Sequence, residues 1–217
     1  YLHRILGRII GIIFFIPLLY FTLRKAIPLV LIPRLYLLLI LGGFQGVLGW
    51  YMVKSGLVDD PNVSQYRLTA HLGMAVFIYS LILWTVFDLS LNYNHAIRSR
   101  IKWMSSTLTL LIFLMILSGG LVAGTRAGIP FPTWPLMGDT FIPPQIYSMN
   151  PSWLSAFEDM ATIQFNHRMF AYLLTILIVI FAIVLLGSNV PRFLKNGTTV
   201  LLFVLSLQVV LGISTLL

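Results

Sequence analysis

Long apolar runs separated by short polar connections dominate the chain. Six of them approach the ~20 residues that a helix needs to cross a bilayer, and they fall at 2–23, 35–53, 68–89, 103–123, 161–186 and 198–217. Because hydrocarbon satisfies no backbone polar group, and the runs lack the two-residue alternation of a membrane barrel, each run predicts a helix. The pattern predicts an all-α integral membrane protein with six transmembrane helices in this chain.

Composition supports this prediction, since 59% of the residues are hydrophobic, 9% are charged and the mean hydropathy is +0.95. The net charge of +8 comes from Lys and Arg spread through the connections without a basic face, so membrane lipid is the expected partner and nucleic acid is not. The chain has no cysteine, which excludes disulfides and thiolate ligands within it. Metal chemistry must therefore use His, Met or carboxylates.

Basic residues mark the connections after the first, third and fifth helices, which the positive-inside rule places in the cytoplasm or mitochondrial matrix. They are Arg24, Lys25, Arg34, Arg98, Arg100, Lys102, Arg192 and Lys195. The other two connections are predicted to face outward and carry most of the acids, namely Asp59, Asp60, Asp139, Glu158 and Asp159. The second of these, 125–160, is proline-rich and contains "SWLSAFEDM", which predicts a short amphipathic turn at the membrane surface. Loops this long are uncommon unless they are functional.

Three histidines, His3, His71 and His167, are placed by this topology at the outer ends of the first, third and fifth helices. A single histidine at a helix end is equally consistent with an interfacial anchor. Three at one depth favour haem ligation, because imidazole commonly holds haem iron between the facing helices of a bundle. His95 falls on the inner side and is interpreted as a solvated loop histidine without a role.

An internal repeat suggests how the histidines pair. His-Arg at 3–4 recurs at 167–168, a shift of 164 residues, and 44–53 aligns with 207–216 at a shift of 163. The second match pairs Gln45 with Gln208 and Gly49 with Gly212. One residue inserted in a connection explains the difference, and the parallel order of the copies predicts a pseudo-twofold axis along the membrane normal.

Applied to His71, the shift of 163 predicts a fourth histidine near position 234, past residue 217. The chain is therefore interpreted as part of a longer protein, in which His3 faces His71 and His167 faces the fourth histidine. Gln45 and Gln208 are read as helix–helix hydrogen bonds in preference to donors behind the ligands. Glycines spaced by four residues are likewise read as close helix packing in preference to room for a flat macrocycle.

Several strings stand out along the chain: "HRILGRIIG", "FQGVLGWYMVKSGL", "VSQYRLTAHLG", "GGLVAGTRAG" followed by "TWPLMGD", "QFNHR" and "QVVLGISTLL". Together they resemble haem A synthase of the proteobacterial and mitochondrial type, over essentially the whole chain. The resemblance implies an eight-helix protein made of two pseudo-twofold-related four-helix bundles, of which this chain holds the second to the seventh helix. It also implies a glutamate just before Tyr1, whose counterpart in the second half is Gln164.

The activity implied by the resemblance is oxidation of the C8 methyl group of haem O to a formyl group, by two hydroxylations and loss of water. The product, haem A, serves cytochrome oxidase. Substrate haem O is expected between His3 and His71 as catalytic axial ligands, and an electron-transferring haem b on His167. Candidate contacts of the haem propionates are Arg4, Arg168, Arg67 and Arg126. Snorkelling to the headgroups explains Arg4 and Arg168 equally well.

The resemblance also predicts an organisation and a location. Residues 1–124 form the half-bundle for haem O, 125–160 the outer loop, and 161–217 an incomplete half-bundle for haem b. The expected location is the bacterial inner (plasma) membrane or the mitochondrial inner membrane, with haem sites near the outer face. Further expected partners are a redox donor, a haem O synthase and a second copy in a homo-oligomer.

Two other classes of protein fit part of the pattern. A non-catalytic dihaem b-type electron carrier would use the same histidine pairs. A secondary transporter would fit the parallel repeat, but it is disfavoured because the spans contain no acid apart from Asp88, near an inner end.

Overall fold

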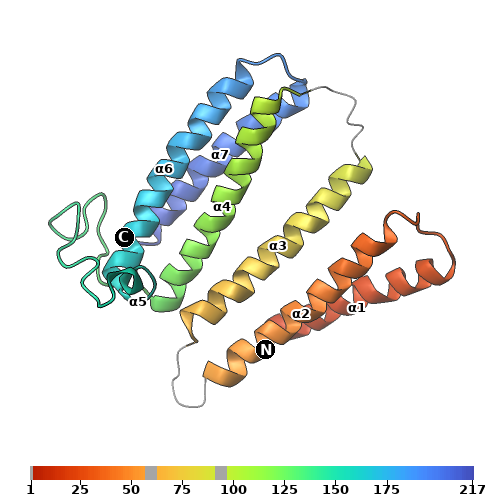
Figure 1. The fold of residues 1–217 in the computed structure, drawn as a ribbon, viewed down its shortest axis with the longest axis horizontal. Coiled ribbons are helices and arrows are strands. Elements are labelled where there is room, and N and C mark those ends of the chain that lie inside the picture. The colour runs from red at the N-terminus through yellow and green to blue at the C-terminus, as the bar shows by residue number, and fades with distance from the viewer. Residues whose placement is uncertain (1, 57–62, 91–96) are drawn as a thin grey trace. The chain divides into compact units, whose positions relative to one another are not determined.

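Helices form most of the computed structural model, which describes residues 2–56, 63–90 and 97–217 (Figure 1). The elements are α1 (Leu2–Leu23), α2 (Ile32–Gly56), α3 (Gln65–Ser90), α4 (Ser99–Thr125), the 3-10 turn η1 (Ser152–Leu154), α5 (Ser155–Glu158), α6 (Met160–Leu186) and α7 (Arg192–Ser214). Six of these helices are long and apolar enough to span a membrane, and the described residues contain no strand. The predicted all-α membrane architecture is confirmed.

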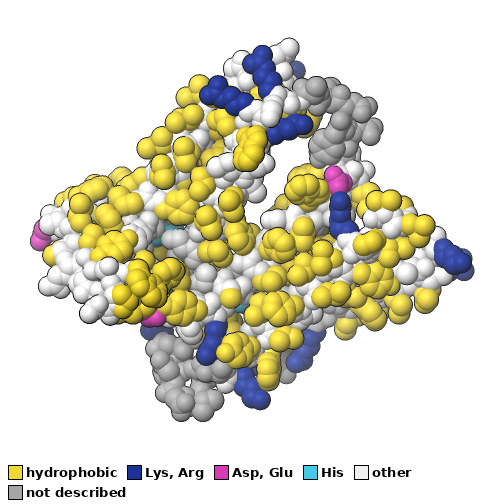
Figure 2. Space-filling model, viewed as in Figure 1, with side chains coloured by type: hydrophobic (Ala, Val, Ile, Leu, Met, Phe, Trp, Pro, Cys, Tyr) yellow, Lys and Arg dark blue, Asp and Glu magenta, His cyan; other side chains and the backbone are white. Residues whose placement is uncertain are grey.

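Lipid-facing side chains cover most of each span. Figure 2 shows hydrophobic side chains over much of the visible surface, with charged side chains mainly near helix ends. Only 6% of the apolar window of α1 is buried inside the protein, against 28% for α6. Because water would penalise so much exposed hydrocarbon, the helices need lipid around them, and α6 is the most enclosed helix.

Residues 1–92 form one compact unit, in which α2 packs against both α1 and α3. At one end of the unit, Arg34 at the start of α2 donates to Asp88 at the end of α3, with 2.7 Å between Nη1 and Oδ2. Arg24 and Lys25 follow α1, beside the start of α2. Asp88 is thus paired with a cation at this end of the unit.

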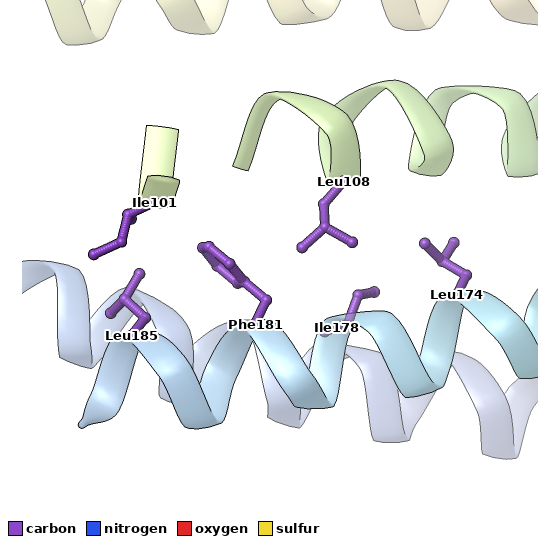
Figure 3. Packing of buried hydrophobic residues seen from close by; sticks show 6 residues of the cluster. All are labelled: Ile101, Leu108, Leu174, Ile178, Phe181 and Leu185. Carbon is purple, nitrogen blue, oxygen red and sulfur yellow. The ribbon is translucent and has the colours of Figure 1, made fainter. Parts of the chain in front are cut away.

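Residues 93–217 form the second unit, built around the packing of α4 and α7 on α6. Figure 3 shows the side chains of α4 and α6 facing one another in its core. The buried members are Ile101, Leu108, Leu174, Ile178, Phe181 and Leu185. The four from α6 follow the spacing of one helix face, so α6 presents a continuous apolar stripe to α4.

The basic connections of the second unit lie at the end where Ile101 and Leu185 pack, because α4 and α7 both start there. Within each unit the histidines lie toward the other end. This arrangement agrees with the topology predicted from charge, while the orientation in a membrane stays a prediction. His95, Asp59 and Asp60 lie outside the described residues.

The long loop before α6 is fastened to that helix. Trp134 Nε1 donates to Tyr172 Oη at 3.0 Å, and Tyr147 Oη donates to Asn166 Oδ1 at 3.0 Å. Asp159 caps α6, accepting from the backbone N–H of Thr162 at 2.8 Å. The predicted turn in "SWLSAFEDM" is present as η1 and α5.

The predicted boundary after residue 124 assigns α4 to the amino-terminal half. In the structure α4 packs most extensively against α6, so its contacts group it with residues 93–217. The assignment of the two duplicated halves stays a prediction. The helices matched by the repeat are α1 with α6 and α2 with α7.

Candidate functional site

His3 and His71 meet across the first unit, as the sequence predicts. The centroids of their rings are 6.4 Å apart, with the ring planes at 83°. His3 lies in the first turn of α1 and His71 in the second turn of α3. Two bonds of about 2 Å from imidazole nitrogens to one metal, plus half of each ring, span about 6 Å. The separation therefore suits two imidazoles bound to one iron from opposite sides.

The ring of His71 rests on α2. Gln45 Nε2 donates to the backbone carbonyl of His71 at 3.0 Å and lies 3.5 Å from its Nε2. A Cβ added at Gly49, one turn further along α2, would lie 3.0 Å from Cε1 of the ring. Among the described residues, Nδ1 of His71 is buried without a hydrogen-bond partner. A buried imidazole nitrogen with no protein partner calls for an explanation, and a bound ligand is one.

Two arginines flank this pair. Arg67 precedes His71 by one helical turn on α3, and its guanidinium lies over the ring of Tyr51, 4.9 Å from the centroid. Arg4 follows His3 and is exposed. Both lie close enough in sequence to reach a carboxylate beside a group held by the histidines, and that role stays a prediction.

His167 is held by α4 in the second unit. Ser118 Oγ lies 3.0 Å from His167 Nδ1, in a hydrogen bond whose donor depends on the tautomer of the ring. A Cβ added at Gly119 would lie 3.5 Å from Cε1 of the same ring. His167 lies in the second turn of α6, and its ring lies beside α4 at Ser118 and Gly119.

An open, shallow cavity of about 560 Å³ lies at the end of α4 in the same unit. Its walls come from the end of α4, the following loop and the end of α7, and include Val122, Arg126, Ile129 and Leu216. Ser118 and Val122 are spaced by four residues, so they lie on one face of α4. Val122 lines the cavity, and so does Arg126, which follows the helix in a left-handed conformation.

Arg168 follows His167 in the chain, but its guanidinium binds the long loop. It is 8% exposed, and its guanidinium donates to the backbone carbonyls of Leu136 at 3.1 Å and Phe131 at 3.0 Å. Gln164 also donates to the Phe131 carbonyl, at 3.1 Å. Arg168 therefore fastens the loop to α6, and it does not snorkel to the surface. Its predicted contact with a propionate stays a prediction.

Sequence reasoning missed the residues that support the histidines. Gly49 and Gln45 were marked by the repeat, but their contact with His71 was not predicted. Ser118 and Gly119 carry no sequence signal beyond a polar and a small residue in an apolar run. In contrast to the predicted close packing, an added Cβ at Gly7, Gly11, Gly42 or Gly46 meets nothing within 4 Å.

Comparison with known families covers the whole chain. Residues 1–217 match the model of the COX15-CtaA family, described as cytochrome oxidase assembly protein. The chain belongs to this family. In this member of the family, the rings of His3 and His71 lie close together and the ring of His167 contacts α4, within a chain of six candidate membrane spans.

Curated relatives carry the name heme A synthase. The protein of Nitrosospira multiformis is 48% identical over 100% of this chain and 62% of its own length. The proteins of Parvibaculum lavamentivorans and Nitrosomonas eutropha are 46% and 42% identical, over 82% and 100% of this chain. The chain spans 52% to 62% of the length of these three relatives. No solved structure matches the chain.

Proposed function

We propose that the protein to which this chain belongs is a haem A synthase, which oxidises the C8 methyl group of haem O to a formyl group. The observation that carries the proposal is the pair of rings of His3 and His71, 6.4 Å apart between α1 and α3. The name shared by relatives that match the whole chain supports the same activity.

The described residues contain no cluster of three or more His, Asp or Glu that could bind a bare metal ion. A facing pair of imidazoles therefore holds iron only when another molecule supplies the remaining ligands. A porphyrin supplies them from its ring nitrogens. This donor set favours a haem substrate over a simple metal ion.

In this proposal His3 and His71 bind haem O from opposite faces and fix where its methyl group lies. Two hydroxylations, each of which needs an external oxidant that removes two electrons from the carbon and an external source of one oxygen atom, convert the methyl group to a geminal diol. Loss of one water from the diol leaves the aldehyde. The protein supplies orientation and exclusion of side reactions, while the reactivity belongs to the haem. In the same proposal Arg4 and Arg67, which are close to the two histidines in sequence, would neutralise the two propionates of the substrate.

The second unit fits a permanent haem b. His167 would offer one axial nitrogen, and the same unit has an open cavity of about 560 Å³ at the end of α4 that exposed Arg126 lines. When bound, haem b would supply electron transfer. We place the protein in a bacterial or mitochondrial inner membrane, with a redox donor and a haem O synthase as partners.

The test is to express the full-length protein with a haem O synthase, extract the pigments and identify them by mass. Haem A is expected with the wild type and with His95→Ala, a matched control for loss of an imidazole. It should be absent with His3→Ala and with His71→Ala. Haem A formation that persists in both of these variants would refute the assignment of the site.

The rival electron carrier gives a different outcome in the same experiment. It would retain its haems chemically unchanged, and haem O supplied to it would be recovered as haem O. Recovery of haem O alone from a fully folded, haem-loaded wild type would therefore favour the carrier and overturn the synthase.

A further inference from the structure

We propose that Ser118 is the positioning residue for His167, holding Nδ1 of the ring so that Nε2 is the nitrogen presented to iron. This inference rests on the proposed function, because it requires that His167 be an axial ligand of haem b. The inference gives Ser118, on a helix that supplies no haem ligand in the proposed function, the role of orienting a ligand on α6.

The geometry selects one ring nitrogen. A neutral imidazole carries its proton on one nitrogen and a lone pair on the other. With the proton on Nδ1, the ring donates to Ser118 Oγ at 3.0 Å, and the lone pair of Nε2 stays free. Gly119 lies beside Cε1 of the ring, which is 3.5 Å from the position of an ideal Cβ, so a side chain at this position would contact the imidazole.

The hydroxyl of Ser118 differs from others in the spans in its choice of partner. Thr109, on the same helix, donates to the carbonyl of Ser105 four residues earlier, at 2.9 Å. Such local bonds are the usual way for a hydroxyl to be satisfied in a membrane helix. Ser118 instead reaches across to α6 and bonds the ring, so its hydroxyl fixes a side chain on another helix.

Because α4 and α6 are joined by the core around Leu108 and Leu174, the distance between Ser118 and His167 is set by a rigid pair of helices. A hydrogen bond to the outer nitrogen of a metal-bound imidazole raises its basicity and fixes its orientation. Loss of such a partner typically lowers metal affinity about 10- to 100-fold.

The experiment uses the full-length protein purified from membranes, with haem b content, the electron paramagnetic resonance spectrum and the midpoint potential of haem b as readouts. Ser118→Ala is expected to lower haem b retention and to raise the midpoint potential, because a less basic imidazole stabilises ferric iron less. Ser118→Thr, which keeps the hydroxyl, should restore both. Thr109→Ala, the matched control on α4, should leave both unchanged.

Two results would overturn the inference. One is a Ser118→Ala protein whose potential and spectrum equal those of the wild type. The other is an equal change in Thr109→Ala, which would show a general effect of removing a hydroxyl from α4. Thermal unfolding of each variant separates loss of fold from loss of ligand geometry, since a purely structural role would not move the potential of the haem that is retained.

His167→Ala separates this inference from the proposed function. If that variant keeps its haem b with an unchanged spectrum, His167 is not a ligand, and the haem b assignment and the role of Ser118 both fail. If His167→Ala loses haem b while Ser118→Ala behaves as wild type, only the role of Ser118 fails.

Discussion

Replacing Gly49 by alanine is expected to disable the site in the first unit while leaving the helix intact. The added Cβ would lie 3.0 Å from Cε1 of His71 and 3.6 Å from each of its ring nitrogens. Carbon atoms pack best at about 3.5–4.0 Å. The ring must therefore retreat from α2 by about 0.5–1 Å.

That displacement is large for a metal ligand, because plausible metal–ligand distances vary by only about 0.2 Å. A misplacement of about 1 Å in a catalytic arrangement can reduce the rate ~100-fold. The opposing effect is small, since alanine improves on glycine in a helix by about 0.5–1 kcal/mol. We therefore expect a folded protein with haem A formation reduced by about two orders of magnitude.

Gly46→Ala is the matched control, because it lies one turn earlier on α2 and an added Cβ there meets nothing within 4 Å. Both variants gain the same helix propensity, so a difference between them reports on His71 alone. The assay is the yield of haem A in membranes supplied with haem O, together with thermal unfolding. Wild-type yield from Gly49→Ala would refute the reasoning, as would an equal loss from Gly46→Ala.

The remaining predictions concern an ion pair of the first unit and the long loop of the second. Asp88→Asn removes the exposed ion pair with Arg34 and should change the free energy of unfolding by about 0–1 kcal/mol without altering the yield of haem A. Thermal unfolding and pigment analysis measure the two quantities. A loss of yield in a folded variant would instead indicate a role of Asp88 in the reaction. Arg168→Gln removes the guanidinium that donates to the carbonyls of Phe131 and Leu136. Limited proteolysis should therefore cut the loop at 126–150 faster than in the wild type. Equal cutting rates would show that the guanidinium does not hold the loop on α6.

The spans and the histidine pair were predictable because hydrocarbon imposes a strong constraint on the sequence. In a membrane, an apolar run such as 68–89 can form a helix and little else. The basic residues in the connections indicate which helix ends lie on the same side of the membrane. His3 and His71 were therefore predicted to meet from their common depth together with the internal repeat, and the structure places their rings 6.4 Å apart.

The supporting contacts were not predictable from sequence, because they depend on the rotation of each helix about its axis. Whether Ser118 reaches α6 or bonds its own helix is decided by tertiary packing, and both outcomes are common for serine in a membrane. Arg168 shows the same limit. Its neighbour His167 suggested a carboxylate partner, whereas loop carbonyls more than thirty residues away occupy its guanidinium.

The cap at Asp159 fixes where α6 begins, and therefore which way His167 points. An insertion or deletion of one residue between the cap and the histidine would swing the imidazole by about 100° around the helix. Length changes upstream of the cap would be absorbed by the loop. Related chains should accordingly differ in length before this aspartate and keep a constant spacing after it.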